Sequence, residues 1–287
     1  MLHRPADTCL TDLQAWTAAF RDRPLRSPPE DAVHGGRQSG TIGLAFLSGY
    51  QAALRALVSD LPRTALVALA ATEDGGAHPK AIETRVEGGR LVGKKNYITL
   101  GTHAERLLVV ARRSPLAREL VVVEIDAHQS GVKLTPLPNT PFVPDVPHAE
   151  LLLDVEIAGA EIRDGDGYSQ YLKPFRTIED LHVLLALLAH GAEVARTSGA
   201  EHILRERIAA AVAALLGLAG RPPLSPALHI ALGGLMPEAR RILEALGDHL
   251  RVSSDERADR WTRDLPVLGV AQRVRQKRLE RAWEAFA

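Results

Sequence analysis

Three neighbouring residues in the second half of the chain can accept a proton in a reaction. Glu179, Asp180 and His182 carry two carboxylates and an imidazole, which are common general bases in enzymes. Glu179 and Asp180 also fall in the first turn of an expected helix, where acidic side chains favourably oppose the helix dipole. Two interpretations therefore stay open for the acidic pair: a catalytic base, or charges that stabilise the start of a helix.

Motifs for phosphate and metal binding are not found in the sequence. It contains no G-x-x-x-x-G-K-[ST], no G-x-G-x-x-G after a strand, no H-E-x-x-H and no cysteine–histidine cluster with metal spacing. The eleven histidines are scattered along the chain. No metal site is predicted.

The charge balance excludes partners that are collected by a strong global field. The chain has 35 Lys+Arg and 35 Asp+Glu, so an anionic ligand must be held by local groups. We therefore expect no nucleic-acid partner. A basic tract near the C-terminus is interpreted as a solvated or inter-subunit face, and it comprises Arg273, Arg275, Lys277, Arg278 and Arg281.

Several features predict a cytoplasmic protein with no membrane partner. Cys9 is the single cysteine and cannot form an internal disulfide, and residues 1–16 lack the pattern of a secretory signal. The longest nearly apolar stretch, 183–194, is well below the roughly 20 residues that span a bilayer. With 46% hydrophobic and 24% charged residues, the composition is that of an ordinary globular protein.

The elements that must position these residues change in character along the chain. Residues 21–40 are rich in Pro, Gly and charge, so a loop or linker is expected there. Leucines and Tyr50 recur every three to four residues from 41 to 61, which predicts a helix that Ser39 or Thr41 caps and Pro62 ends.

After Pro62, short runs of β-forming residues alternate with turn residues. Gly88-Gly89 separates two of them and predicts a hairpin, because glycine tolerates the positive φ of a tight turn. Without long helices between them, the runs favour an antiparallel barrel or sandwich. The seven expected strands are 65–72, 81–86, 90–99, 106–111, 120–125, 132–137 and 151–157.

Helical periodicity returns from Phe175 onward. Helices are expected over about 177–197, 200–218, 225–250 and 255–286, with a turn at 220–223 and a helix start or kink at Pro266. The predicted fold is α+β in three parts: an N-terminal helical segment over 1–62, a β-domain over 63–172 and a helical bundle over 173–287.

The stretch 68–112 resembles the β-domain of the acyl-CoA dehydrogenase family. That family's pattern is Thr-Glu, a glycine-containing turn, a hairpin and G-x-K-x-W-I-T-N-G. The matching positions are Thr72-Glu73, Gly75-Gly76, Gly93, Lys95, Tyr97-Ile98-Thr99 and Gly101. The resemblance implies an N-terminal helical part, a central antiparallel β-barrel and a C-terminal helical bundle. The N-terminal part over 1–62 is shortened here relative to the larger helical domain of full members.

The resemblance also implies FAD as the cofactor, lying between the barrel and the C-terminal helices. Thr72 would then bond the pyrimidine edge of the flavin, Thr99 would approach N5, and Tyr97 would take the place of the usual tryptophan against the ring. Taken alone, these residues are also ordinary strand formers. His78 replaces a serine of the family near the ligand entrance, or is a solvated loop histidine.

The resemblance places the family's catalytic glutamate at one of two positions. In most members it follows an Arg-Asp pair, and counting from Arg263-Asp264 puts Gln272 there. In the second arrangement it lies on the first C-terminal helix, where counting back from Gly191 puts Leu181 at the base. Glu179 and Asp180 are near enough to substitute if the register differs.

Three functions follow as hypotheses. The first is an FAD-dependent oxidoreductase of acyl-CoA dehydrogenase type, acting on the CH–CH group of an acyl thioester and involved in lipid metabolism. The second is a catalytically degenerate binding or assembly subunit, and the third is a flavin monooxygenase or oxidase on the same fold. The resemblance also implies a homodimer or homotetramer, or a mixed assembly with a paralogue.

Overall fold

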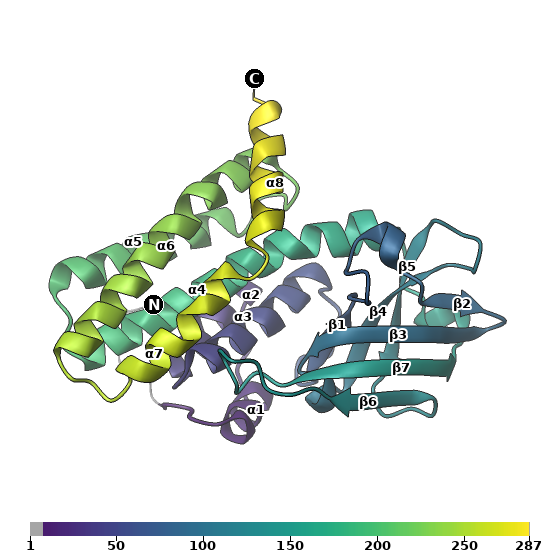
Figure 1. Cartoon of the computed structure of the whole chain (residues 1–287), viewed down its shortest axis with the longest axis horizontal. Coiled ribbons are helices and arrows are strands. Elements are labelled where there is room, and N and C mark those ends of the chain that lie inside the picture. The colour runs from purple at the N-terminus through teal and green to yellow at the C-terminus, as the bar shows by residue number, and fades with distance from the viewer. Residues whose placement is uncertain (1–7, 287) are drawn as a thin grey trace. The chain divides into compact units, whose positions relative to one another are not determined.

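The computed structural model describes residues 8–286. The first seven residues of the predicted 1–62 segment, and residue 287 of the predicted bundle, lie outside the described residues. The chain divides into two compact units (Figure 1). Unit 1 holds the described residues up to Ala56, the segment Thr140–Asp145 and the described residues from Thr177 onward, and unit 2 holds Leu57–Asn139 and Val146–Arg176. The three-part division at 62 and 172 stays a prediction.

Unit 2 is built on one sheet, and the seven strands expected from the sequence are confirmed. Its short 3-10 and π-helical turns are η1 (Pro79–Ala81), η2 (Gly101–His103), η3 (Gly159–Glu161) and η4 (Gly167–Leu172). The strands are β1 (Val67–Ala70), β2 (Arg85–Glu87), β3 (Arg90–Thr99), β4 (Arg106–Arg112), β5 (Leu120–Asp126), β6 (Val132–Pro136) and β7 (His148–Glu156).

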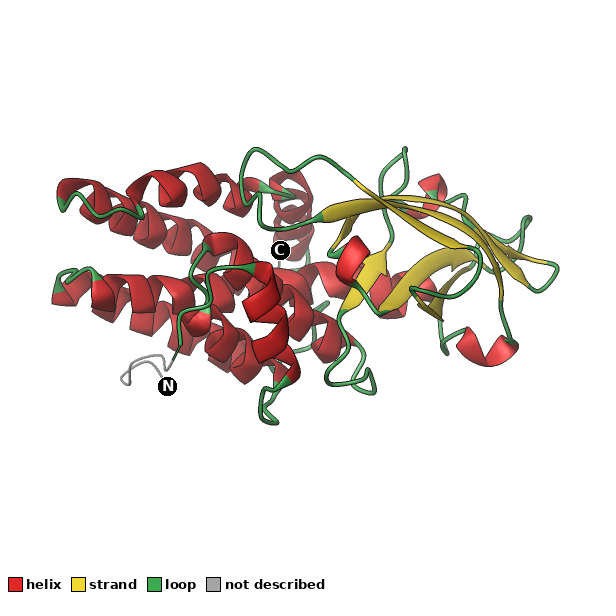
Figure 2. Ribbon diagram, turned by 90° about the horizontal axis from the view of Figure 1, so that it is seen from below, coloured by secondary structure: helices red, strands yellow, loops and turns green. Residues whose placement is uncertain are grey.

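The prediction of an antiparallel barrel needs correction, because the sheet is mixed and open. The strand order is β1-β4-β2-β3-β7-β6, with β5 also paired to β4. β4 runs parallel to β1 and β2, whereas the other pairings are antiparallel. Among the described residues β5 and β6 do not pair, so the sheet is not closed (strands in Figure 2). Strand patterning alone does not specify the partner of a strand.

The predicted β2–β3 hairpin is confirmed. Gly88 and Gly89 have φ of 56° and 77°, as a primed two-residue turn requires. One face of the sheet is apolar and buried. Alternate residues of β3 to β5 and β7, such as Leu91, Val123 and Leu153, form the core of unit 2 there. The opposite face of β3 is left for polar and exposed side chains.

Unit 1 is helical, and the last residue of α3 and the first turn of α4 are counted with unit 2. α5 and α6 contact each other and run side by side (Figure 1). The helices are α1 (Leu13–Arg21), α2 (Pro28–Gln38), α3 (Ile42–Leu57), α4 (Lys173–Thr197), α5 (His202–Leu218), α6 (Pro226–Val252), α7 (Ala258–Asp264) and α8 (Gln272–Glu284).

The expectation of a loop over residues 21–40 is wrong, because α2 occupies Pro28–Gln38. Ser27 and Glu30 form a capping box, and prolines fill the first two helical positions, where no N–H partner is needed. The glycines that suggested a loop allow close packing instead. A Cβ on Gly36 would lie 2.2 Å from the carbonyl oxygen of Ala186 in α4.

The helix expected from residue 41 forms as α3, and Thr41 caps it: the Leu44 N–H donates to Thr41 Oγ1 over 3.1 Å. The prediction that Pro62 ends this helix is wrong, because α3 already ends at Leu57. The helix expected over 255–286 is instead broken into α7, the 3-10 turn η5 (Leu265–Gly269) and α8. Pro266 lies at the start of η5, and Ala271 adopts a left-handed conformation with φ of 64° just before α8. No helix within residues 8–286 combines the length and apolar character needed to cross a bilayer.

Candidate functional site

Tyr97 is presented to solvent by a bulge in β3. Lys95 pairs with Leu151 and Ile98 with Ala149, so β3 has one extra residue against β7 at this point. Tyr97 takes the left-handed conformation, with φ of 53°, and its side chain is 67% exposed. Because a non-glycine residue rarely adopts this conformation, the bulge holds an aromatic ring in a specific place on the outer face of β3.

Thr72 and Thr99 lie near Tyr97 in unit 2. The Asn96 N–H donates to the carbonyl oxygen of Thr72 over 2.8 Å, which ties the loop after β1 to the bulge. Thr99 ends β3 opposite His148. Both threonines are half-buried, and in the described residues neither hydroxyl makes a hydrogen bond to another protein group. The backbone of Thr72 is thus tied to the residue before Tyr97, and Thr99 follows Tyr97 by two positions on the same strand.

A buried ion pair fixes the loop that carries Thr72. Lys95 points into the core from the bulge, and its Nζ donates to Glu73 Oε1 over 2.6 Å. Glu73 also accepts from the backbone N–H groups of Glu83 and Thr84, over 2.7 and 3.1 Å. One carboxylate therefore connects the Thr72 loop, the approach to β2 and the β3 bulge.

The pair is charged at neutral pH. Burial lowers the pKa of Lys95 to about 8, although the Glu73 carboxylate acts in the opposite direction. Burial acts to raise the pKa of Glu73, but the Lys95 ammonium and the N–H donors outweigh it and leave this pKa below its ordinary value. Lys95 therefore keeps its proton at pH 7 and holds Glu73 as a carboxylate.

His78 lies on the exposed loop that precedes η1. Its Nδ1 accepts a hydrogen bond from the Lys80 N–H over 3.2 Å, so the imidazole caps the short η1 turn. Its predicted place at a ligand entrance stays a prediction.

Asp180 binds two arginines of α8 within unit 1. Its Oδ1 accepts from Arg275 Nε over 2.8 Å, and its Oδ2 contacts Arg278 Nη2. The Arg278 guanidinium also donates to Thr177 Oγ1 over 3.1 Å. Two residues of the basic tract thus face α4 instead of solvent, and the Asp180 carboxylate links α4 to α8. Glu179, on the same turn, is half-buried.

Leu181, the second position at which the resemblance places the catalytic base, and the next residue, His182, are both buried. Leu181 and His182 are each 3% exposed, and His182 Nδ1 lies 2.8 Å from the carbonyl oxygen of Ile178. Burial lowers the pKa of His182 to about 4, opposed only by that backbone bond. The imidazole is therefore neutral at physiological pH.

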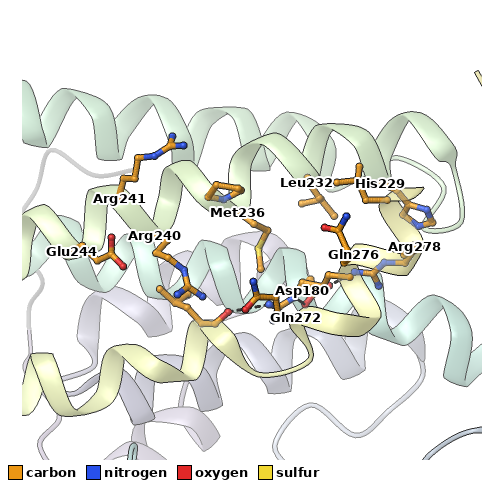
Figure 3. A pocket seen from close by; sticks show the side chains of 15 residues that line it. Asp180, His229, Leu232, Met236, Arg240, Arg241, Glu244, Gln272, Gln276 and Arg278 are labelled. Carbon is orange, nitrogen blue, oxygen red and sulfur yellow. Dashed lines mark hydrogen bonds and ion pairs between the residues drawn. The ribbon is translucent and has the colours of Figure 1, made fainter. Parts of the chain in front are cut away.

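Unit 1 contains a pocket of about 480 Å³ to which both predicted base regions contribute. Asp180 comes from α4, and Gln272 comes from the first position of α8 (Figure 3). Arg240 and Met236 extend from α6 toward α8, whereas Arg241 turns to the other side of its helix. In the sequence, Gln272 and Asp180 belong to the two alternative positions of the catalytic base. In the structure, both residues line one cavity.

Sequence reasoning missed two relationships in these sites. Glu73 and Lys95 were noted as pattern positions, but nothing in their spacing indicated that they pair. The link from Asp180 to α8 was missed because the basic tract was interpreted as a surface. A signal existed there: Arg275 and Arg278 are three residues apart and so lie on one face of a helix.

Comparison with known proteins gives similarity of structure but not of sequence. Neither a family model nor a curated protein sequence matches the chain. Among solved structures, the FAD complex of PigA matches with a TM-score of 0.73 and 14% identity, over 96% of this chain and 90% of that one. The prolyl acyl carrier protein oxidase AnaB matches with a TM-score of 0.69 and 16% identity, over 93% and 89%.

Butyryl-CoA dehydrogenase from Megasphaera elsdenii matches with a TM-score of 0.65 and 14% identity, over 95% of this chain and 82% of that one. In all three comparisons the match extends over both units of the chain. The resemblance found in residues 68–112 therefore holds for the whole described architecture. This chain has the fold of the acyl-CoA dehydrogenases.

Proposed function

We propose that this chain is a flavoprotein that binds FAD and oxidises the acyl part of a thioester. The observation that carries the proposal is the outer face of β3, where the exposed ring of Tyr97 lies near the half-buried hydroxyls of Thr72 and Thr99. An aromatic surface and two hydroxyls without protein partners suit a flat heteroaromatic ring with polar edges. The fold shared with the FAD complex of PigA supports the same cofactor.

Each residue has a separate role in this proposal. The Thr72 hydroxyl and nearby backbone hold the pyrimidine edge of the flavin, the Thr99 hydroxyl holds the N5 region, and the Tyr97 ring contacts the ring system. FAD, when bound, accepts a hydride from the substrate. The Glu73–Lys95 pair acts through position alone, because it fixes the Thr72 loop against the bulge.

The proposed substrate is an acyl group carried as a thioester on CoA or on a carrier protein. Two structures with this fold are named for such substrates, an acyl carrier protein oxidase and butyryl-CoA dehydrogenase. We also propose that the chain self-associates as a homodimer or homotetramer. Native mass spectrometry tests this together with FAD content, because one spectrum reports subunit number and bound cofactor.

FAD titration followed by visible absorbance tests the cofactor site. We expect the wild-type chain to bind FAD, and we expect Tyr97→Ala and the double variant Thr72→Val/Thr99→Val to weaken binding at least tenfold. Thr135→Val is the matched control, because Thr135 is an exposed strand threonine on β6 in the same unit. A wild-type chain that takes up no FAD contradicts the proposal.

A second candidate function is a flavin-binding or assembly subunit without turnover of its own. The observation behind it is that neither candidate position offers a free carboxylate base. Two guanidinium groups bind Asp180, and residue 272 is a glutamine, whose amide cannot accept the α-proton. Glu179 then becomes the acid to test. Turnover of an acyl-CoA by the FAD-loaded chain, lost in Glu179→Gln with FAD retained, supports the oxidoreductase. Turnover only after addition of a full-length paralogue supports the second candidate.

A further inference from the structure

The pocket of unit 1 has the features of a binding site for a small anion with an apolar part. Its volume of about 480 Å³ falls in the range of roughly 300–1,000 Å³ that is typical of sites for small organic molecules. Five apolar side chains line it: Leu232, Met236, Pro237, Leu268 and Leu279. The same cavity is lined by several arginines, so it combines an apolar wall with cationic groups.

The arginines of the pocket are not fully neutralised by the protein. Arg275 and Arg278 share the single carboxylate of Asp180. Arg241 shares the carboxylate of Glu238, on its own helix, with Arg207 of α5. Arg240 makes no ion pair or hydrogen bond within residues 8–286, although it extends into the cavity toward Gln272 (Figure 3). A guanidinium with five donors and no acceptor is the group in this pocket most suited to a ligand carboxylate.

The balance of guanidinium and carboxylate groups that line the pocket indicates the charge of the ligand that fits it. Arg241 is set aside because its side chain is 66% exposed to solvent. The other three guanidinium groups of the pocket face the carboxylates of Asp180 and Glu244. One positive charge remains in excess. A monoanion balances it, whereas a dianion leaves a negative charge in a partly apolar cavity, which is unfavourable.

We propose that this pocket binds a monoanionic organic acid with an apolar chain. The Arg240 guanidinium binds the carboxylate, the Gln272 amide lies beside it as a further donor, and the chain packs against Met236 and the neighbouring leucines. All residues that line the pocket belong to unit 1, and none of them is among the residues of the proposed flavin face. The proposal therefore does not depend on FAD binding.

Isothermal titration of the full chain with sodium octanoate tests the proposal at near-neutral pH and low salt. We expect saturable binding with one site per chain, and at least a tenfold loss of affinity in Arg240→Gln, because one charge-assisted hydrogen bond is worth about that factor or more. Arg251→Gln is the matched control: it removes an exposed arginine of the same helix, which pairs with Asp248 and does not line the pocket, and should change affinity less than twofold. Octanamide has the same chain without the charge and should not bind measurably.

Several results would overturn the proposal. They are the absence of saturable octanoate binding, equal losses in the two arginine variants, equal binding of octanamide, or inorganic phosphate that competes as well as octanoate does. Circular dichroism checks that each variant is folded. If Arg240→Gln does not fold, Met236→Trp carries the test: it narrows the apolar part of the cavity, and unchanged octanoate affinity in that variant would also overturn the proposal.

Discussion

Lys95 Nζ lies 2.6 Å from Glu73 Oε1 in a part of unit 2 where the lysine side chain has no exposed surface. A charged group at this depth is tolerated only while it is paired, since an isolated buried charge is strongly unfavourable. The pair also joins the loop that carries Thr72 to the bulge that carries Tyr97. Stability of unit 2 and geometry of the proposed flavin face thus depend on the same two residues.

Glu73→Gln is expected to destabilise the protein by about 3–5 kcal/mol, because it leaves the Lys95 ammonium buried without its carboxylate. Urea unfolding at pH 7 measures this change. The double variant Glu73→Gln/Lys95→Met should recover most of the loss, since no unpaired charge remains. Arg90→Gln is the control: it breaks an exposed pair with Asp154, so it should change the free energy of unfolding far less than Glu73→Gln does. Equal effects in Glu73→Gln and Arg90→Gln would contradict the structural role of the pair.

Asp180→Asn separates an anchoring role from a catalytic one. The Asp180 carboxylate, 10% exposed, holds Arg275 and Arg278, so its loss should weaken the packing of α8 and lower the free energy of unfolding by about 1–3 kcal/mol. Asp248→Asn is the matched control, because Asp248 pairs with Arg251 on an exposed turn of α6. A catalytic base would instead show a loss of turnover without a change in unfolding. That pattern would restore the interpretation of Asp180 as the base.

Much of the local structure could be predicted because it depends on local patterns. The expected β3 strand matches the observed Arg90–Thr99, and the Gly88-Gly89 turn has the positive φ values that its sequence indicates. Strand pairing was not predictable in the same way. β1 and β4 are parallel partners separated by more than thirty residues, and no residue type in either strand specifies the other.

The errors have identifiable physical causes. The low helix propensity of glycine favours a loop over residues 21–40, where α2 is found. In the structure, these glycines instead allow close approach to another helix: a Cβ on Gly35 would lie 2.7 Å from Ser48 Cβ in α3. The pocket shared by Asp180 and Gln272 could not be predicted, since it depends on how α8 returns against α4 and α6 after the break at Pro266. The sequence identifies both candidate base regions, but it does not indicate that their side chains line the same pocket.

The buried histidines predict a loss of stability in mild acid. Burial lowers the pKa of His182 to about 4 and that of His190 to about 4, whereas histidine in the unfolded chain titrates near about 6.5. Between these values the unfolded chain binds protons that the folded chain does not. The free energy of unfolding therefore decreases as the pH falls from about 6.5 toward 4, by up to about 3 kcal/mol for each histidine.

Urea unfolding at several pH values measures this dependence. His182→Leu should flatten the slope between pH 6.5 and 4 by roughly half, because one of the two buried imidazoles no longer titrates. His202→Gln is the control, since His202 is exposed at the start of α5 and should leave the slope as it is. A wild-type slope that His182→Leu does not change would show that other groups cause the acid sensitivity.

Two glycines in helices should respond to alanine in opposite directions. A Cβ on Gly36 of α2 would lie 2.2 Å from the carbonyl oxygen of Ala186, and backbone atoms of α4 cannot move aside cheaply. Overpacking of about 2 kcal/mol or more should therefore exceed the roughly 1 kcal/mol that alanine gains in helix propensity, so Gly36→Ala is expected to destabilise unit 1. Gly234 of α6 is exposed with open space around its Cβ position, so Gly234→Ala should stabilise the protein by about 0.5–1 kcal/mol. Urea unfolding of both variants checks the contrast, and a stabilised Gly36→Ala would mean that α2 does not pack on α4 at this distance.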